Sequence, residues 1–314
     1  MKKRGRNMRY RRSIYRKNGI HVYILITAGV LIAVVLIFVL LGNALGDKAE
    51  KSESERASSK TTDSTSEEHI TPRNVSAYPV PLSADGSNLR SRISQTVALG
   101  YTDVCFDLDT KTDSLLYMSN VAISLGYLSS DAQLWDLSEA VKLFDDGGLY
   151  TVGITHLSRM NTENDLERQV ASGYYTARIA EALRSGVDDV LISPEDLPFS
   201  TYSELTVIAD EVHRLCPNST IGISVTPEML SSDGSGDLVD TLWNSFDYIA
   251  VNLDGEPNEG ESISQMAEHQ LGGMLYYLLR YNMRVLIPNA DNETIAQIKN
   301  SLSQNGVKNM LILP

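Results

Sequence analysis

The sequence predicts an α/β fold in which short parallel strands alternate with helices, and three observations in residues 74–314 lead to it. Eight short apolar runs rich in β-branched residues are spread along this stretch. Longer segments with helical periodicity separate most of these runs. Several of the helical segments stop at a glycine, and the next apolar run begins at once. The repeating strand–helix alternation is typical of a parallel sheet.

The strands come first, because their number decides the architecture. Fully apolar runs of this kind fit a sheet that is buried on both faces. Eight units in 241 residues favour a closed (β/α)8 TIM barrel over an open doubly wound sheet. The predicted strands are Val75–Val80, Val104–Leu108, Tyr150–Ile154, Val190–Ile192, Ile221–Val225, Tyr248–Val251, Arg284–Ile287 and Met310–Leu313.

The helices between them carry apolar residues on one face. In the last helix, Ile295, Ile298 and Leu302 recur at the spacing of an inward-facing stripe. Gly100, Gly186 and Gly306 each follow a predicted helix, where glycine takes the left-handed C-cap conformation at little cost. Among the predicted helices are Leu134–Phe144, Tyr174–Arg184, Tyr202–Leu215, Ser262–Arg280 and Glu293–Ser303.

Residues 1–73 have a different composition. Residues 1–19 carry nine Lys/Arg and no Asp/Glu, and they predict a basic cytoplasmic tail. Residues 20–42 predict a transmembrane helix, because the 20 residues Val22–Leu41 contain no charge and match the thickness of a bilayer. The alternative is a signal peptide cleaved near Ala44, although its apolar core would be unusually long.

Residues 43–73 predict a disordered linker. The stretch from Asp47 to His69 is rich in Ser, Thr and charged residues and has almost nothing apolar to bury. The expected arrangement is therefore a single-pass protein of the cell membrane. Its N-terminus is cytoplasmic, the bilayer is one of its partners, and residues 74–314 form an extracellular domain.

Charge and motifs exclude several classes of function. Nine of the 27 basic residues lie in residues 1–19, which leaves the other 295 residues with a net charge of −22. An acidic domain of this kind repels phosphate backbones, so no nucleic acid is expected as a partner. The five histidines show no metal-ligand spacing, and phosphate-loop and dinucleotide motifs are absent. We therefore expect neither a metal nor a cofactor.

Polar residues at the carboxyl ends of the predicted strands form the candidate site, because active sites of such barrels lie there. Glycoside hydrolysis usually requires two carboxyl groups, one of which must be protonated to act as the general acid. Glu195, with Asp196 beside it, is the candidate acid. The candidate catalytic residues are Glu195, Asp196, Asp107, Asp109 and Asp254. The candidate ligand-binding residues are Tyr78, His156, Ser193, Asn252 and Asp291, the last of which is equally well read as a helix cap.

Two motifs resemble those of known families. Gly186–Glu195 reads GVDDVLISPE and resembles the fourth-strand signature of chitinase-like glycoside hydrolases, in which Glu195 falls on the acid/base glutamate. Phe246–Asn252 resembles the sixth strand of the same family, with Asp254 near that family's Tyr-Asp pair. Val104–Asp109, followed by Ser114–Tyr117, is similar to the second strand of a glycosyl hydrolase domain found in bacterial envelope proteins. The resemblance implies a TIM-barrel glycoside hydrolase.

The chain also departs from these families. The two inner aspartates of the chitinase-like signature are Leu191 and Ser193 here, and its Trp is Pro194. In that family the second of these aspartates orients the N-acetyl group that attacks the anomeric carbon, and Ser193 lacks the charge. Two hypotheses follow. The barrel hydrolyses an envelope or extracellular glycan with Glu195 as acid, or it is an inactive barrel retained as a glycan-binding or envelope scaffold. A sensor that signals through the membrane helix is a weaker third.

Overall fold

The computed structural model describes residues 73–82, 86–194, 197–231, 235–253, 262–288 and 290–314. The predicted tail, the transmembrane helix at residues 20–42 and nearly all of the linker lie outside the described residues. So do three of the candidate catalytic residues, Glu195, Asp196 and Asp254. Within the described ranges, no helix has both the length and the apolar character that a membrane crossing requires.

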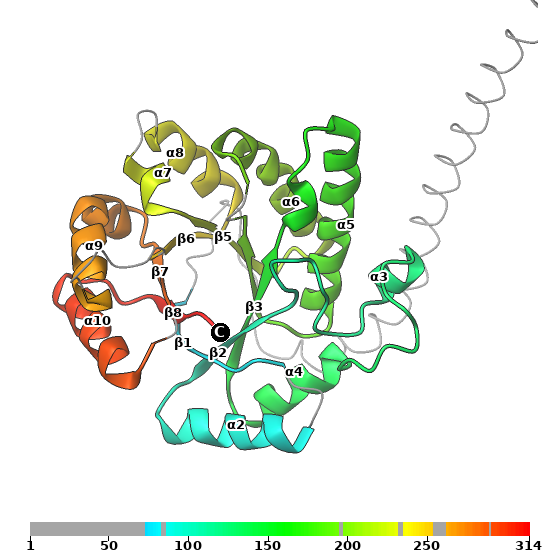
Figure 1. Ribbon diagram of the computed structural model, residues 1–314, viewed down its shortest axis with the longest axis horizontal. Coiled ribbons are helices and arrows are strands. Elements are labelled where there is room, and N and C mark those ends of the chain that lie inside the picture. The colour runs from blue at the N-terminus through cyan, green and yellow to red at the C-terminus, as the bar shows by residue number, and fades with distance from the viewer. Residues whose placement is uncertain (1–72, 83–85, 195–196, 232–234, 254–261, 289) are drawn as a thin grey trace, which may run out of the picture. The chain divides into compact units, whose positions relative to one another are not determined.

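The strands form a closed barrel, which confirms the predicted (β/α)8 architecture (Figure 1). All eight pairs of neighbouring strands are parallel, and β8 pairs with β1 to close the ring. Each predicted strand corresponds to one observed strand. The strands are β1 (Ser76–Pro79), β2 (Asp103–Asp107), β3 (Tyr150–His156), β4 (Asp189–Ser193), β5 (Thr220–Val225), β6 (Tyr248–Asn252), β7 (Arg284–Ile287) and β8 (Met310–Ile312).

Helices surround the barrel, as Figure 1 shows. The helix predicted at Tyr174–Arg184 is longer at its N-terminus, because two more exposed turns precede its buried part. The α-helices are α2 (Gly86–Ala98), α3 (Asn120–Ser124), α4 (Leu137–Asp146), α5 (Asp165–Arg184), α6 (Tyr202–Leu215), α7 (Pro227–Ser231), α8 (Ser235–Ser245), α9 (Ile263–Arg280) and α10 (Asn292–Gln304). Two short 3-10 helices, η1 (Ser158–Met160) and η2 (Phe199–Thr201), follow β3 and β4.

The helix ends follow the sequence signals. Gly100, Gly186 and Gly306 all have positive φ angles, of 83°, 101° and 83°, in the left-handed region that glycine tolerates. Ser262 begins α9 with a complete capping box, in which its side chain accepts from the backbone N–H of Gln265. These caps set the points at which the chain turns from each helix into the next strand.

Alternation along the strands divides the buried residues into two cores. In β4, Val190 and Ile192 point outward and pack against the helices. Leu191, on the other face of the same strand, lies in a smaller cluster inside the barrel. Asp189 and Ser193 therefore also point inward, one at each end of β4.

A polar cluster fills the amino-terminal end of the barrel. The Arg284 guanidinium donates to the Asp189 carboxylate at 2.5 Å, and the Tyr248 hydroxyl donates to the same group at 2.8 Å. Arg284 also lies over the Tyr248 ring, 3.5 Å from its centroid. All three side chains are buried. They seal this end, so the barrel interior is approached from the carboxyl end of the strands.

Candidate functional site

The carboxyl ends of β2, β3 and β4 bring three of the candidate residues together. Asp107, His156 and Ser193 each come two residues after an inward-facing residue. Because side chains alternate along a strand, they also point inward, as Cys105, Ile154 and Leu191 do. The Nε2 atom of His156 lies 3.5 Å from Oδ1 of Asp107. His156 is 11% exposed and Asp107 is 30% exposed, so the pair is accessible from the barrel mouth.

Two more polar side chains face the same mouth. Ser224, on β5, lies 3.5 Å from Ser193, measured between their hydroxyl oxygens. Asn252 is the last residue of β6 and points inward after Ala250. Both side chains are buried. Among the described residues, the mouth is therefore lined by hydroxyl, amide and imidazole groups, by the side chain of Lys111 and by one partly exposed carboxylate.

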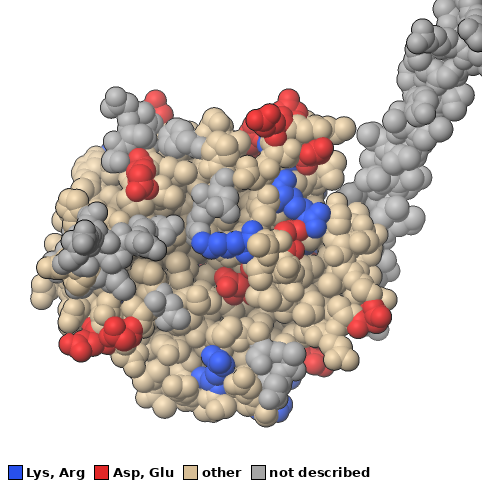
Figure 2. Space-filling model, in the orientation of Figure 1, with Lys and Arg blue, Asp and Glu red and all other residues tan. Residues whose placement is uncertain are grey.

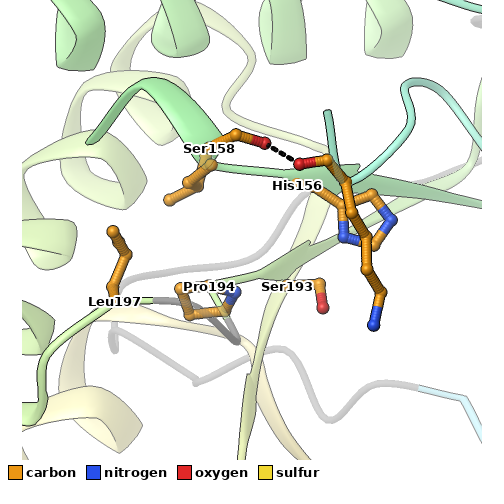
Figure 3. A pocket seen from close by; sticks show the side chains of 7 residues that line it. His156, Ser158, Ser193, Pro194 and Leu197 are labelled. Atoms are coloured by element: carbon orange, nitrogen blue, oxygen red, sulfur yellow. Dashed lines mark hydrogen bonds between the residues drawn. The ribbon is translucent and has the colours of Figure 1, made fainter. Parts of the chain in front are cut away.

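A small pocket of about 10 Å³, room for roughly one water molecule, opens at this mouth (Figure 3). His156 and Ser193 supply its polar groups at the ends of β3 and β4, and Pro194 and Leu197 supply apolar surface. The hydroxyl of Ser158 donates to the backbone carbonyl of Lys111 at 2.7 Å, which ties the β2 and β3 loops together. Glu195 follows Pro194 directly in the sequence but lies outside the described residues.

Asp109 is placed differently from Asp107. Its carboxylate is fully buried and receives the Arg178 guanidinium at 2.8 Å, the Thr155 hydroxyl at 2.9 Å and the His156 backbone N–H at 2.6 Å. Burial raises the pKa of Asp109, and the Arg178 charge and these hydrogen bonds oppose the rise. With its oxygens used in this way, Asp109 holds the end of β3 in place and does not face the mouth.

Arg178 is a neighbour of the site that the sequence pattern does not mark as a candidate. It lies on α5 and is 2% exposed, with its guanidinium 5.2 Å from the Tyr174 ring centroid. The available signal was a charged residue on the apolar face of a predicted helix, four residues after Tyr174. Such a residue needs a buried partner of opposite charge, and the sequence does not show that the partner is Asp109.

Two other candidates lie away from the mouth. Tyr78 is on the outer face of β1, where its ring centroid lies 4.9 Å from that of Tyr101. Asp291 is the N-cap of α10, and its carboxylate accepts from the backbone N–H groups of Glu293 and Thr294 at 2.9 Å each. Those hydrogen bonds lower the pKa of Asp291. Its cap role follows from this geometry.

Figure 2 shows acidic side chains around the edge of the face in view, and a basic and an acidic side chain close together near its centre. Across the described ranges, no group of three or more His, Cys, Asp or Glu side chains is arranged to hold a metal ion.

No protein-family model matches the chain. No curated protein matches it either. Solved structures do match the fold. The spore cortex-lytic enzyme SleL of Bacillus cereus has a TM-score of 0.50 and 9% sequence identity, covering 76% of this chain and 70% of that one. A protein designated an α-L-fucosidase, from Bacteroides thetaiotaomicron, has a TM-score of 0.55 and 10% identity, covering 81% and 90%. The likeness is one of fold: the described residues form the same TIM-barrel architecture as these two structures.

Proposed function

We propose that the barrel acts on a glycan of the cell envelope or the extracellular space. One observation carries the proposal: Asp107, His156 and Ser193 meet at the carboxyl end of a barrel whose opposite end is sealed. This is the end at which TIM-barrel enzymes carry out their chemistry. The two structures similar in fold support a glycan as ligand, since one is a spore cortex-lytic enzyme and the other is designated a fucosidase.

In the catalytic form of the proposal, Glu195 donates a proton to the leaving glycosidic oxygen. Asp107 is the partner carboxylate, because Asp109 is neutralised by Arg178. His156 stands 3.5 Å from Asp107, where its imidazole can orient the carboxylate toward the mouth. Asp107 then acts on the opposite side of the sugar, as a base for water or as a nucleophile.

A second candidate function is recognition of a glycan without cleavage. Leu191 points into the barrel core and Ser193 stands uncharged at the mouth, at the positions where chitinase-like enzymes carry aspartates. With Asp109 also held by Arg178, Asp107 is the one candidate catalytic carboxylate left at the mouth among the described residues. A barrel of this kind retains the pocket and its hydrogen-bonding groups and binds the glycan without breaking it.

Binding and hydrolysis assays of the full-length chain in mild detergent separate these functions. Wild type is compared with Glu195→Gln and Asp107→Asn on peptidoglycan and N-acetylglucosamine polymers, with Glu139→Gln, a change on the exposed start of α4, as the matched control. Cleavage that both mouth variants abolish supports the enzyme. Binding without cleavage in all forms supports the recognition protein. If wild type neither binds nor cleaves any of these glycans, both functions are rejected.

We also propose that Val22–Leu41 anchors the chain as a single span, with residues 1–19 in the cytoplasm and the barrel outside. The support is the uncharged 20-residue stretch and the nine positive charges before it. Protease added to intact cells should digest the barrel domain, and carbonate washing should leave the chain in the membrane fraction. Release by carbonate, or protection until the cells are lysed, contradicts this arrangement.

A further inference from the structure

A groove beside the barrel mouth is lined by aromatic, apolar and charged side chains. Its volume is about 400 Å³, within the range of small-molecule sites. Three of its lining residues are large apolar side chains that remain exposed, Tyr127 at 44%, Leu166 at 69% and Val170 at 58%. Exposed apolar residues gathered in one place indicate a binding surface.

Arg159 is fixed at the edge of this groove. Its guanidinium lies 3.9 Å from the centroid of the Tyr127 ring and forms an ion pair with Asp113. The hydroxyl of Tyr175 donates to Asp113 at 3.2 Å and accepts the backbone N–H of Arg159 at 3.1 Å. Asp113 has a φ angle of 63°, a conformation that non-glycine residues adopt when their surroundings hold them in it. The arginine and the aromatic ring are therefore set in place before any ligand arrives.

The groove and the mouth pocket are lined by neighbouring residues of η1. Ser158 lines the mouth pocket, and the next residue, Arg159, lines the groove. Consecutive Cα atoms are about 3.8 Å apart, so a single peptide unit separates a lining residue of one hollow from a lining residue of the other. A ligand too large for the mouth pocket, which has a volume of only about 10 Å³, would pass over η1 to reach Tyr127.

We propose that this groove, lined by Tyr127, Arg159 and Glu167, is a second subsite for an extended glycan bound at the barrel mouth. The inference rests on the proposed function. The exposed Tyr127 ring and the neighbouring Leu166 and Val170 offer an apolar surface to the C–H face of a sugar ring. Arg159 donates hydrogen bonds to ring hydroxyl or acetamido oxygens, and the Glu167 carboxylate accepts from hydroxyls. A mixed surface of this kind matches a sugar, which is apolar on its faces and polar at its edges.

The test measures the affinity of the full-length chain for soluble oligosaccharides of increasing length. The panel contains N-acetylglucosamine oligomers, muropeptide-derived glycans and fucosylated oligosaccharides, each as a dimer and as a hexamer or longest available form. Tyr127→Ala should weaken binding of the long form roughly tenfold, as truncation of an aromatic hot spot does, and leave the dimer unchanged. Tyr127→Phe keeps the ring and should bind as wild type does.

The matched control is Tyr276→Ala. Tyr276 is a 62% exposed tyrosine on α9 that also pairs with an arginine, since its hydroxyl accepts from Arg280 at 2.6 Å. Tyr276→Ala should leave the affinities for the dimer and for the long oligosaccharide unchanged. Equal affinity of wild type and Tyr127→Ala for a long glycan that wild type binds overturns the subsite and leaves the proposed function standing. Failure of wild type to bind any member of the panel overturns the proposed function, and the subsite with it.

Discussion

Gly222 shows how one residue makes room for the polar cluster that seals the barrel. A Cβ atom at this position would come within 3.0 Å of three ring carbons of Tyr248. The ring cannot yield easily, because its hydroxyl is bonded to Asp189 and its face is covered by Arg284. Glycine at position 222 is therefore required by the close approach of the tyrosine.

We predict that Gly222→Ala destabilises the protein by about 1–3 kcal/mol, the usual cost of overpacking a core. Urea unfolding measures the change. Gly173→Ala is the control, since Gly173 lies inside α5 with nothing within 4 Å of an added Cβ. That change should stabilise by roughly 0.5–1 kcal/mol, because alanine is the better helix residue. If Gly222→Ala unfolds at the wild-type urea concentration, Tyr248 is not held as described.

His213 gives a second prediction at this scale. Its Nε2 atom lies 3.0 Å from the Asp247 carboxylate, and this hydrogen bond raises the pKa of His213, with Asp210 on the same helix acting in the same direction. Asp247 also accepts the backbone N–H of Ile221 at the start of β5. A raised pKa in the folded state means that the protonated histidine stabilises the fold.

This stabilisation is fully present below the unfolded pKa of about 6.5 and is lost as the pH rises through the higher folded pKa. We predict that His213→Gln reduces the free energy of unfolding at pH 5.5 by at most about 1 kcal/mol, because the pair is partly exposed. At pH 9 the difference between the variant and wild type should shrink toward zero. A difference that is equal at both pH values contradicts the ion pair.

At the scale of elements, the link between α5 and β2 depends on a buried ion pair. Arg178 and Asp109 are 2% and 0% exposed and lie 2.8 Å apart. We predict that Arg178→Met destabilises the protein by about 3–5 kcal/mol, because Asp109 is left buried and uncompensated. Adding Asp109→Asn to this variant should recover part of the loss. Denaturant unfolding of the single and double variants measures both effects.

The control for this prediction is on the same helix. Arg168 pairs with Asp165 and Glu204, which are 84% and 48% exposed. Arg168→Met should therefore change stability by no more than about 1 kcal/mol. A similar effect from the two arginine variants, or no recovery in the double variant, indicates that Arg178 contributes through its packing and not through its charge.

The elements also show what the sequence reveals about the fold. Every strand was predicted, because β-branched apolar runs mark both faces of a buried sheet. The observed strands are longer than the predicted ones where a strand continues through polar residues. β4 begins at Asp189 and β3 ends at His156, and both side chains point inward and interrupt the apolar pattern. The start of α5 was missed because Leu166 and Val170 are exposed and break the periodicity of a buried face.

The candidate site was predictable only in part. Position at a strand end identified both Asp107 and Asp109, two residues apart in one sequence motif. Alternation would place both on the inner face, but the chain leaves the strand after Asp107, and Asp109 turns to Arg178. The partner of a buried charge depends on how a helix packs against the barrel. The groove at Tyr127 depends in the same way on loops that only the fold brings together.

At the scale of the whole molecule, one end of the barrel is open at the mouth and the other end is sealed. The cluster of Asp189, Tyr248 and Arg284 blocks the amino-terminal end, whereas smaller polar groups line the mouth. The interior between them is apolar. The barrel interior is therefore approached from the mouth, where Ser158 lines the mouth pocket and the next residue, Arg159, lines the Tyr127 groove. This asymmetry depends on a closed ring, since an open sheet would expose the interior along its edges.

Closure is made by the last strand of the chain. β8 joins β7 to β1, and the backbone N–H of Met310 donates to the carbonyl of Val75 at 2.9 Å. The Asn309 side chain adds a bond from the backbone N–H of Val75 at 3.3 Å. Because strands β1 to β8 all lie within residues 74–314, we predict that a fragment of residues 70–314 folds cooperatively. Deleting residues 309–314 from it should abolish that folding.

The physical reason is that the deletion leaves β1 and β7 as two unpaired edges and removes Leu311 from the barrel core. The fragment should show a sharp urea transition and near-ultraviolet circular dichroism, and the shortened form should show neither. Removing Pro314 alone is the control, because this residue is exposed and lies outside β8. A cooperative transition in the fragment that lacks residues 309–314 would mean that seven strands hold the fold, and that β8 closes the ring without stabilising it.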